Sequence, residues 1–523
     1  MIRSRLIDRR PRRIRTWRRV GLHAALLLAA CTGTRLCAQA IPAASPDAQH
    51  IADIESRLNE VTATLAQTQK ALQQSLVDIE YLRTQLNAIR QTSAALPPPP
   101  PPNTTASSVP VEAQIAALHE QQDVLQAEIK QHDQTKVETE SKYSLKVTGL
   151  VLFNAFATAG VVDNAELPSL ALPRNPGSSH GSLGASARQT VFGVVASGPV
   201  IAGAQTSATL NVDFFGGSTT NTFGYTAPDG FVRMRDSQLS LDWSQTTLQL
   251  GYTNPLISPL SPTSYATVAQ PALSYSGNLW AWSPQIRIEQ RVPLSGNSGF
   301  ALEAGLISPV SPIYNSIQLD SPIEASRRPA VEGRISFHAD NTTNSSPHSL
   351  AFGVGAYSAN QFYNSANRIH SWAVTGDWRI PLSQWLDLSG EVYRGRSLGG
   401  LGGGVYKDIL SGTDPITGLS RTVGVETAGG WAQLKLNIGQ HLEANTMFGL
   451  DDAFASSLRS VILPSGSGAL TQSARNSTVT GNLIFRPRSS LFISPEYRRL
   501  LTWRITGAPY AANIFTLSAG YQF

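Results

Sequence analysis

Polar side chains, several of them charged, recur at every second position in short segments of the C-terminal part of the chain. Polar and aliphatic residues alternate in 285–292 apart from Gln290, and the same spacing returns in 331–338, 374–380 and 432–438. The residues that we single out are Arg287, Glu289, Arg291, Glu332, Arg334, Asp377, Arg379, Lys435 and, just beyond, Glu443. Facing water, such side chains can select dissolved ions by charge, and arginine pairs readily with carboxylate or phosphate. The same side chains can equally form ion pairs that only brace a wall.

Catalytic chemistry has little support in the sequence. A nucleophile needs a positioned base. The chain has no H-E-x-x-H motif, and its nine histidines are scattered without the spacing of metal ligands. The glycines in 399–404 lack the strand-then-helix setting of a nucleotide-binding loop and predict a flexible surface loop. We therefore expect no enzyme activity, no cofactor and no metal.

Residues 1–40 predict an export signal. Ten arginines lie in this segment, an apolar stretch covers 21–30, and Ala38-Gln39-Ala40 offers a cleavage site. The apolar stretch is too short to span a bilayer. A second interpretation stays open, in which 28–31 form a lipobox and Cys31 carries a lipid. Without residues 1–40, 31 bases and 35 acids remain, a net charge of −4, so the +5 of the whole chain does not indicate a nucleic-acid partner.

Residues 41–96 predict a coiled-coil helix, because apolar residues follow a spacing of 3.5 over six heptads. The seam residues are Ile51, Ile54, Leu58, Val61, Leu65, Leu72, Ile79, Leu82, Leu86 and Ile89. A narrow apolar stripe needs partner helices, so we expect self-association. The proline-rich segment 97–110 predicts a stiff linker, and 111–142 predicts a second, shorter coiled coil. Seam composition does not favour a dimer but leaves the number of helices open.

Residues 143–523 predict an all-β transmembrane barrel. One face of each alternating segment suits lipid and the other suits water, and only a closed barrel satisfies every strand hydrogen bond in hydrocarbon. About 380 residues, at roughly 21–24 per strand and connection, give about 16–18 strands. Charges on the lipid side would cost about 2–4 kcal/mol each at the bilayer midplane. A soluble sandwich with a single core could hardly serve so long a segment.

Several local features refine this prediction. We expect long external loops at 163–186, 339–349, 396–420 and 464–478, whereas 255–271 fits either an external loop or one folded into the lumen. Arg233 and Arg235 share the parity of apolar Leu239, which indicates either a bulge between them or a place at the membrane rim. Five tryptophans suit interfacial girdles but fit ordinary packing equally well, namely Trp280, Trp282, Trp378, Trp385 and Trp503.

The last nine residues alternate strictly and end on an aromatic residue. Apolar side chains occupy the odd positions from Phe515 to Phe523, and small or polar ones occupy the even positions. This pattern resembles the C-terminal signature strand of outer-membrane proteins. The resemblance implies that Tyr521 and Phe523 are read by the barrel-assembly machinery.

The whole layout resembles the DcaP-like trimeric outer-membrane transporters, with phosphate-selective porins as the nearest relatives. The matching stretches are 248–252 (LQLGY), 284–288 (PQIRI) and 429–454. The resemblance implies a homotrimeric porin in outer-membrane lipid, with its coiled coil in the periplasm, passing small hydrophilic and often anionic solutes such as carboxylates. Phosphate selectivity fits less well, because residues 143–523 contain only three lysines. The alternatives are a structural tether between membrane and periplasm or, with less support, an outer-membrane enzyme.

Overall fold

The computed structural model describes residues 143–177, 179–216, 230–294, 297–310, 320–341, 348–364 and 367–523. The predicted signal segment, both predicted coiled coils and the proline-rich linker lie outside these residues. No helix in the described ranges is long and apolar enough to cross a bilayer.

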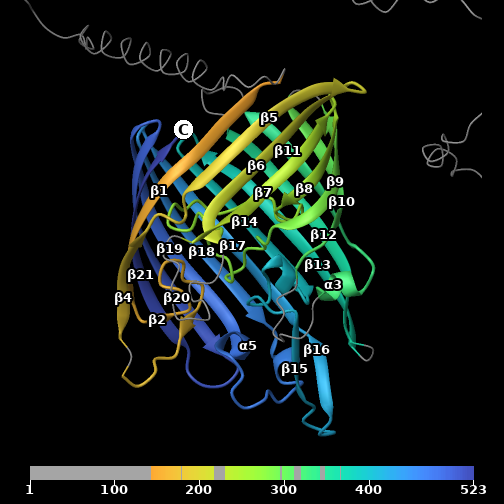
Figure 1. The fold of residues 1–523 in the computed structure, drawn as a ribbon, viewed down its shortest axis with the longest axis vertical. Helices are drawn as coiled ribbons and strands as arrows, with labels where there is room; N and C mark the ends of the chain where they lie inside the picture. The colour runs from red at the N-terminus through yellow and green to blue at the C-terminus, as the bar shows by residue number, and fades with distance from the viewer. Residues whose placement is uncertain are drawn as a thin grey trace, which may run out of the picture. The chain divides into compact units, whose positions relative to one another are not determined.

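Sixteen strands of the described residues close into one antiparallel barrel (Figure 1). Each wall strand pairs with the next, and β1 pairs with β21 on one edge and with β5 on the other. A short strand, β4 (Gly181–Ser186), extends the second wall strand, because it pairs with the C-terminal part of β1 beyond the reach of β5. The predicted closed barrel is confirmed, at the lower end of the predicted strand number.

The wall strands are β1 (Leu145–Ala159), β5 (Val191–Ile201), β6 (Ala204–Gly216), β7 (Phe231–Asp242), β8 (Thr246–Thr253), β9 (Ser283–Pro293), β10 (Ser298–Ile307), β11 (Ala330–Asn341), β12 (His348–Asn364), β13 (Asn367–Ser383), β14 (Leu386–Arg396), β17 (Glu426–Ile438), β18 (Leu442–Ala453), β19 (Ser473–Arg488), β20 (Leu491–Arg504) and β21 (Tyr510–Gln522). Short elements lie in the connections: β2 (Val161–Val162), β3 (Ala171–Leu172), β15 (Ile409–Thr413), β16 (Ser420–Gly424), α3 (Pro322–Ala325), α4 (Ala455–Leu458), α5 (Ala469–Gln472) and the 3-10 turn η1 (Gly399–Leu401).

The two ends of the barrel differ in their connections. Tight hairpins such as β5–β6 and β7–β8 lie at the end that holds Tyr143 and Phe523, and the long connections lie at the other end (Figure 1). The connection in 339–349 joins β11 to β12 at the hairpin end, so our prediction of a long external loop there is wrong. Short turns on one side and long loops on the other are typical of outer-membrane barrels, where the long loops face outward from the cell.

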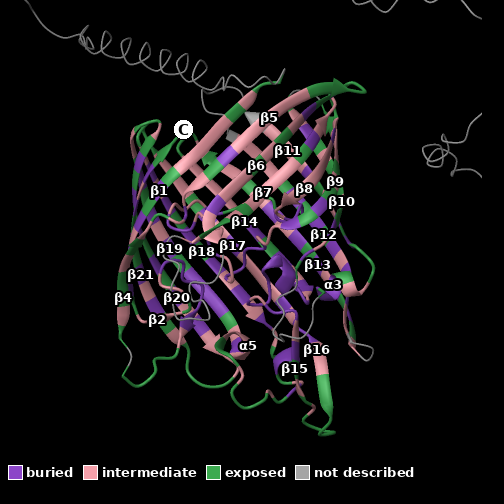
Figure 2. Ribbon diagram, viewed as in Figure 1, coloured by how far each residue is buried: buried purple, intermediate pink, exposed green. Residues whose placement is uncertain are grey.

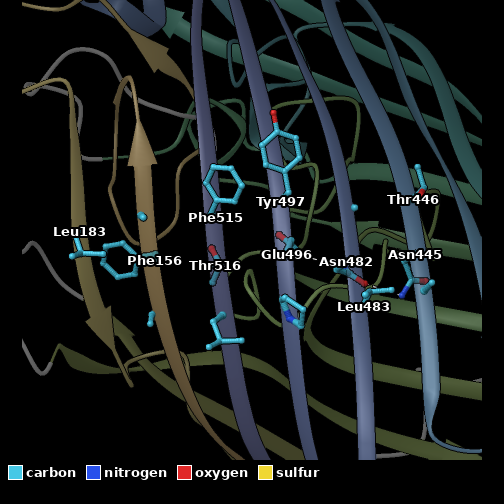
Figure 3. Close-up of a pocket in the computed structure, with 16 residues that line it drawn as sticks. Phe156, Leu183, Asn445, Thr446, Asn482, Leu483, Glu496, Tyr497, Phe515 and Thr516 are labelled. Carbon is cyan, nitrogen blue, oxygen red and sulfur yellow. Dashed lines mark hydrogen bonds between the residues drawn. The ribbon is translucent and has the colours of Figure 1, made fainter.

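The apolar face of the wall is the outer one. On β11, Ile335 is 58% exposed on the outside, whereas Ser336 is 8% exposed and faces inward. Figure 2 shows buried and exposed residues alternating in this way along the wall strands. Figure 3 draws consecutive residues of opposite parity on two adjacent strands, Glu496 and Tyr497 on β20 and Phe515 and Thr516 on β21. Because aliphatic and aromatic residues cover the outside, the wall presents an apolar belt to acyl chains.

The C-terminus seals the closure between the last and first strands. The backbone N–H of Gly149 donates to the Phe523 carbonyl at 2.9 Å, and the Phe523 N–H donates back to Gly149 at 3.0 Å. The Phe523 ring lies flat over Gly149, where an added Cβ would stand 2.5 Å from the ring. A side chain larger than hydrogen at 149 would therefore displace the terminal aromatic ring.

A β-bulge on β7 explains the parity of its arginines. Asn211 pairs with Asp236 and Val212 pairs with Met234, which leaves Arg235 as the extra residue. The bulge reverses the alternation, so Arg233 reaches an inward carboxylate while Leu239 stays exposed outside. Of the two predicted explanations, the bulge is confirmed.

The main hydrophobic core lies inside the barrel, where loops fold into the lumen. Residues 254–282, which join β8 to β9 and are called here the inner loop, fold into the lumen. Residues 397–408, called here the glycine-rich loop, follow β14 and pack against them. The cluster comprises Leu256, Ile257, Leu279, Ile307, Ile323, Ala330, Tyr357, Ala359, Ala373, Tyr393, Leu398 and Leu401. The prediction of a flexible surface loop at 399–404 is therefore wrong.

The glycine-rich loop is held in a strained and buried conformation. Ser397, Val405 and Tyr406 have φ angles of 56°, 50° and 59°, a region that costs a non-glycine residue free energy. Lys407 is fully buried, and within the described ranges its ammonium donates only to the carbonyls of Val405 and Leu470, at 3.4 and 3.3 Å. Burial lowers the pKa of Lys407 to about 7, against the opposing attraction of Asp451.

The sidedness of the wall predicts opposite effects of the same charge at adjacent positions of β17. Leu434→Arg places a guanidinium among acyl chains and is expected to cost about 2–4 kcal/mol of unfolding free energy. Lys435→Arg, one residue on, faces the lumen and should leave stability unchanged. Urea unfolding of both variants in lipid vesicles measures this difference. Equal destabilisation would contradict the assigned faces.

Lys407→Met should stabilise the barrel most at or below pH 7. The pKa of this lysine is lowered when packed and ordinary when unpacked, so only the unpacked form stays protonated between about 7 and 10.5. Wild-type stability contributed by this site therefore rises with pH across that window, by about 1.4 kcal/mol for each tenfold difference in proton affinity between the packed and unpacked forms.

The measurement is the temperature at which the folded, heat-modifiable band disappears, for both proteins at several pH values. The gap between Lys407→Met and wild type should shrink as pH rises from 7 to 10. Because both proteins share the other titrating groups, a gap that stays constant would show that Lys407 is charged inside the barrel or is not buried.

Candidate functional site: the interior of the barrel

The inner loop follows the lumen wall and is hydrogen-bonded to it at successive strands. Glu332 on β11 accepts the Leu256 N–H at 3.1 Å, and the Thr375 hydroxyl on β13 donates to the Ile257 carbonyl at 2.7 Å. Glu391 on β14 accepts the Ser258 hydroxyl and, at 2.7 Å, the Leu260 N–H. Each anchor is a polar wall residue that satisfies a loop group, which is what buried polar groups require.

The anchoring continues around the barrel. Gln433 accepts the Thr263 N–H at 2.7 Å, and Glu496 accepts the Ser264 hydroxyl at 2.5 Å. Gln189 then holds two points of the loop: it donates to Ala266 at 3.1 Å and accepts from Ala269 at 3.0 Å. The inner loop therefore narrows the lumen, which decides between the two alternatives left open for 255–271.

A second segment folds inward beside it. Residues 163–170, called here the first loop, are turned by Asp163, which accepts the N–H groups of Ser169 and Leu170 at 2.9 Å each. Arg498 on β20 donates to the Pro168 carbonyl at 3.1 Å. Where the first loop, the inner loop and the β19–β20 wall meet, they enclose a cavity of only about 10 Å³. The two loops therefore pack closely against this part of the wall.

The inner loop carries no charge. Residues 254–282 contain no Asp, Glu, Lys, Arg or His, and are rich in Ser, Thr, Tyr and Trp. Trp280 lies against Gly402 and Trp282 lies under Arg235, both in the inner loop, so of the two interpretations packing holds for them and the interfacial girdle does not. All fixed charge near the narrowing therefore comes from the wall and from the other loops.

The predicted charged residues of β9, together with Arg379 on β13, face the lumen and are accessible. Arg291 pairs with Glu289 at 2.9 Å, and both side chains are about a third exposed. Arg287 donates to Gln249 at 2.5 Å. Within the described residues, neither Arg287 nor Arg379 lies within ion-pairing distance of a carboxylate, so each presents a guanidinium to the lumen.

The other predicted residues are locked into networks. Arg334 donates to both Asp377 oxygens, at 2.9 and 2.8 Å, and to Glu303 at 2.5 Å. Lys435 lies 3.4 Å from Glu443. Glu332 is buried beneath the inner loop. The structure thus separates the predicted set into free or lightly paired arginines and residues that brace the wall.

Several interior residues were missed by the sequence analysis. Glu303 completes the Arg334 network, and Arg486 lies 3.2 Å from Glu443. Glu391, a principal anchor, alternates with Asp387 and Ser389, a signal that would have found it. No local pattern marks Glu496 as a loop anchor, because its partner lies 232 residues away in sequence.

Arginines and aromatic rings alternate at the mouth of the barrel. The Arg188 guanidinium lies 4.5 Å from the Phe215 ring, and Arg233 lies between that ring and Trp282, at 5.9 and 5.6 Å. Arg235 also lies over Trp282, at 5.0 Å. Arg233 and Arg235 both contact Asp213 and donate to inner-loop carbonyls. These contacts therefore fix the middle of the inner loop, at Val268 and Ala269, and its last residue, Trp282, to β7.

One segment has the spacing of a serine nucleophile motif, but not its setting. In 177–181 (GSSHG), the Ser179 hydroxyl donates to the Gly181 carbonyl at 2.6 Å in an exposed connection that leads into strand β4. A nucleophile elbow instead leads from a strand into a helix and is paired with a base. Among the described residues, no cluster of three or more His, Cys, Asp or Glu is arranged to hold a metal ion.

A groove of about 640 Å³ crosses the outer wall over β1, β4 and β18–β21 (Figure 3). Its floor has small outward residues such as Ala155, Ala444 and Gly481, and its sides have Tyr497 and Phe515. Because it lies in the apolar belt, it is a surface for acyl chains or protein and not part of the lumen.

Comparison with known proteins gives the fold. No sequence-family model and no curated protein matches the chain. The outer-membrane channel DcaP of Acinetobacter baumannii is similar in structure, with a TM-score of 0.54 and 16% identity over 74% of this chain and 99% of that one. An anion-selective porin from Comamonas acidovorans has a TM-score of 0.47 and 13% identity, over 73% and 100% of the two chains. Pseudomonas putida OprB has a TM-score of 0.43 and 9% identity, over 72% and 94%. The barrel thus has the fold of the DcaP channel, which confirms at the level of fold the resemblance seen in the sequence.

Proposed function

We propose that this protein is an outer-membrane porin through which small hydrophilic solutes, preferentially anions such as carboxylates, diffuse passively. The observation that carries the proposal is the pairing of an uncharged inner loop with free arginines on the wall, Arg287 and Arg379. Water and ions meet these guanidinium groups without a neutralising carboxylate at contact distance. Fixed charge beside a narrowing is what gives pores of this kind their ion selectivity.

The proposal extends to the setting of the barrel. The long-loop end faces the cell exterior, and the coiled coils predicted in 41–96 and 111–142 extend into the periplasm. The exposed aromatic residues Tyr521 and Phe523 serve as the signal for barrel assembly. The similarity to a channel fold, together with the polar lumen, favours transport over catalysis, and we expect no enzyme activity.

Current through single proteins in planar bilayers tests this proposal. We expect the current to rise in steps. Under a salt gradient, the reversal potential should have the sign that shows anions to be more permeant than cations. Replacing Arg287 and Arg379 by glutamine should lower the anion-to-cation permeability ratio by up to about 16-fold per charge, because one charge at 5 Å in water lowers an anion's energy and raises a cation's by about 0.8 kcal/mol each.

Arg421→Gln is the matched control, since Arg421 is an exposed arginine in strand β16 of the connection between β14 and β17. Its replacement should leave the reversal potential unchanged. An absence of conductance in the folded wild type would refute the porin, and an unaltered ratio in the double variant would refute the role of the two arginines.

We further propose that three chains associate through the predicted heptad seam. Leu65→Asp with Leu72→Asp puts carboxylates into that seam and should convert trimers to monomers. Gln67→Asp changes a position off the seam and should leave the trimer intact. Native mass spectrometry of the full chain in detergent measures both. A trimer that survives the seam variant would show that the barrel, not the coiled coil, holds the assembly.

A further inference from the structure

Arginines gather on the outer face of the barrel at its long-loop end. Arg394 and Arg396 lie near the end of β14, Arg475 lies near the start of β19, and Arg459 follows α4. Val392 is exposed on the outer wall, and Arg394, two residues further along β14, lies on the same face. The register pairs Arg475 with Asp452 and with Trp503, so these three side chains share the outer face.

A hollow of about 540 Å³, called here the rim pocket, lies among these side chains. Phe454, Ser456 and Arg459 line one side, and Arg475 and Trp503 line the other. The Arg475 side chain is 45% exposed. The rim pocket therefore opens to the surroundings of the barrel and lies outside the lumen.

The cations of this region exceed the carboxylates that face them. Glu426 lies 2.6 Å from Arg394 and 3.8 Å from Arg396, and Asp452 lies 2.6 Å from Arg475. Within the described residues, the Arg459 guanidinium has no ion pair or hydrogen bond. Four arginines thus stand against two carboxylates. An anion in the rim pocket would meet the whole Arg459 fork and the outer edge of Arg475.

Aromatic rings beside the rim pocket indicate that it lies at the height of the membrane interface. The Arg475 guanidinium lies 5.7 Å from the Trp503 ring, and Arg394 lies 4.3 Å from the Phe454 ring. Directly below on the same outer face, Phe448 and Val479 are exposed in the apolar belt. Aromatic girdles lie where acyl chains meet headgroups. An occupant with a phosphate above and acyl chains below would contact both the arginines and the belt.

We propose that the rim pocket binds the phosphate of an anionic lipid headgroup in the outer leaflet, with Arg459 and Arg475 as its donors. The guanidinium forks pair with phosphate oxygens, and the acyl chains of the same lipid lie on the belt beneath Trp503. A free phosphate would contact the arginines alone. The site goes beyond transport, because it lies on the lipid side of the wall and does not depend on a conducting lumen.

Native mass spectrometry of the full-chain protein in detergent tests this site, with diphosphorylated lipid A, its dephosphorylated form and inorganic phosphate as separate probes. We expect the phosphorylated lipid to be retained and the dephosphorylated lipid to be lost. Arg459→Gln should weaken retention about tenfold, the equivalent of one charge-assisted hydrogen bond of about 1.4 kcal/mol. Arg475→Gln should weaken it by at least as much, and Arg421→Gln, an exposed arginine elsewhere in the same loops, should not change it.

The result that decides is that of Arg459→Gln, because this side chain makes no hydrogen bond or ion pair with the described residues, whereas Arg475→Gln also breaks the pair with Asp452. Equal retention of both lipid forms would overturn the proposal, and so would unchanged retention in Arg459→Gln. Inorganic phosphate that displaces the lipid at equal concentration would assign the site to free anions and overturn its assignment to lipid.

Discussion

Backbone hydrogen bonds that water cannot replace govern this structure. In hydrocarbon, an unpaired N–H or C=O costs several kcal/mol, so the strands must close on themselves. The last pairing, between β21 and β1, is therefore as important as any other, and it places the Phe523 ring on Gly149. In a closed barrel, every second side chain of each strand faces outward and the others face the lumen. The apolar belt, the polar lumen and the room for an inner loop all follow from that single requirement.

The interior of the barrel reverses the usual relation between charge and burial. A soluble protein of this length would bury leucine and expose glutamate, whereas here Glu391 is buried and Ile335 is exposed. Buried polar wall groups are stable because the inner loop supplies their hydrogen-bond partners. The loop thus satisfies the wall while it narrows the lumen. Since the loop is uncharged, the ionic character of the pore is left to those wall arginines that the networks do not neutralise.

Alternation is the feature of the sequence that predicts the structure most directly. A strand that divides lipid from water must repeat every two residues, so the faces of Arg287, Arg334 and Lys435 are predictable from spacing alone. The bulge at Arg235 is one of two explanations that the sequence allows, because a break in parity needs an extra residue or a change of environment. The end of the barrel at which a connection lies is harder to predict: 339–349 is polar, but the pairing of Asn341 with His348 puts this connection at the hairpin end.

The inner core cannot be predicted in the same way. The glycines at 399–404 suggest exposure, but small residues also allow close packing, and here they fit against Trp280, Leu279 and Tyr393. The fate of such a segment depends on contacts made far away in sequence, such as that between Ser264 and Glu496. Local spacing carries no trace of these contacts. For the same reason, the sequence leaves open whether the tryptophans of the inner loop lie at the membrane interface or pack inside the barrel.

The accessibility of two adjacent positions to a water-soluble thiol reagent tests the sidedness of the wall most directly. Neither cysteine of the chain lies within the barrel, so a cysteine placed at 434 or 435 would be the only one there. During bilayer recording, a charged methanethiosulfonate should reduce the current through Lys435→Cys and leave that through Leu434→Cys unchanged. Modification at 434 but not at 435 would contradict the account, because it would place the aliphatic face in water and the charged face in lipid.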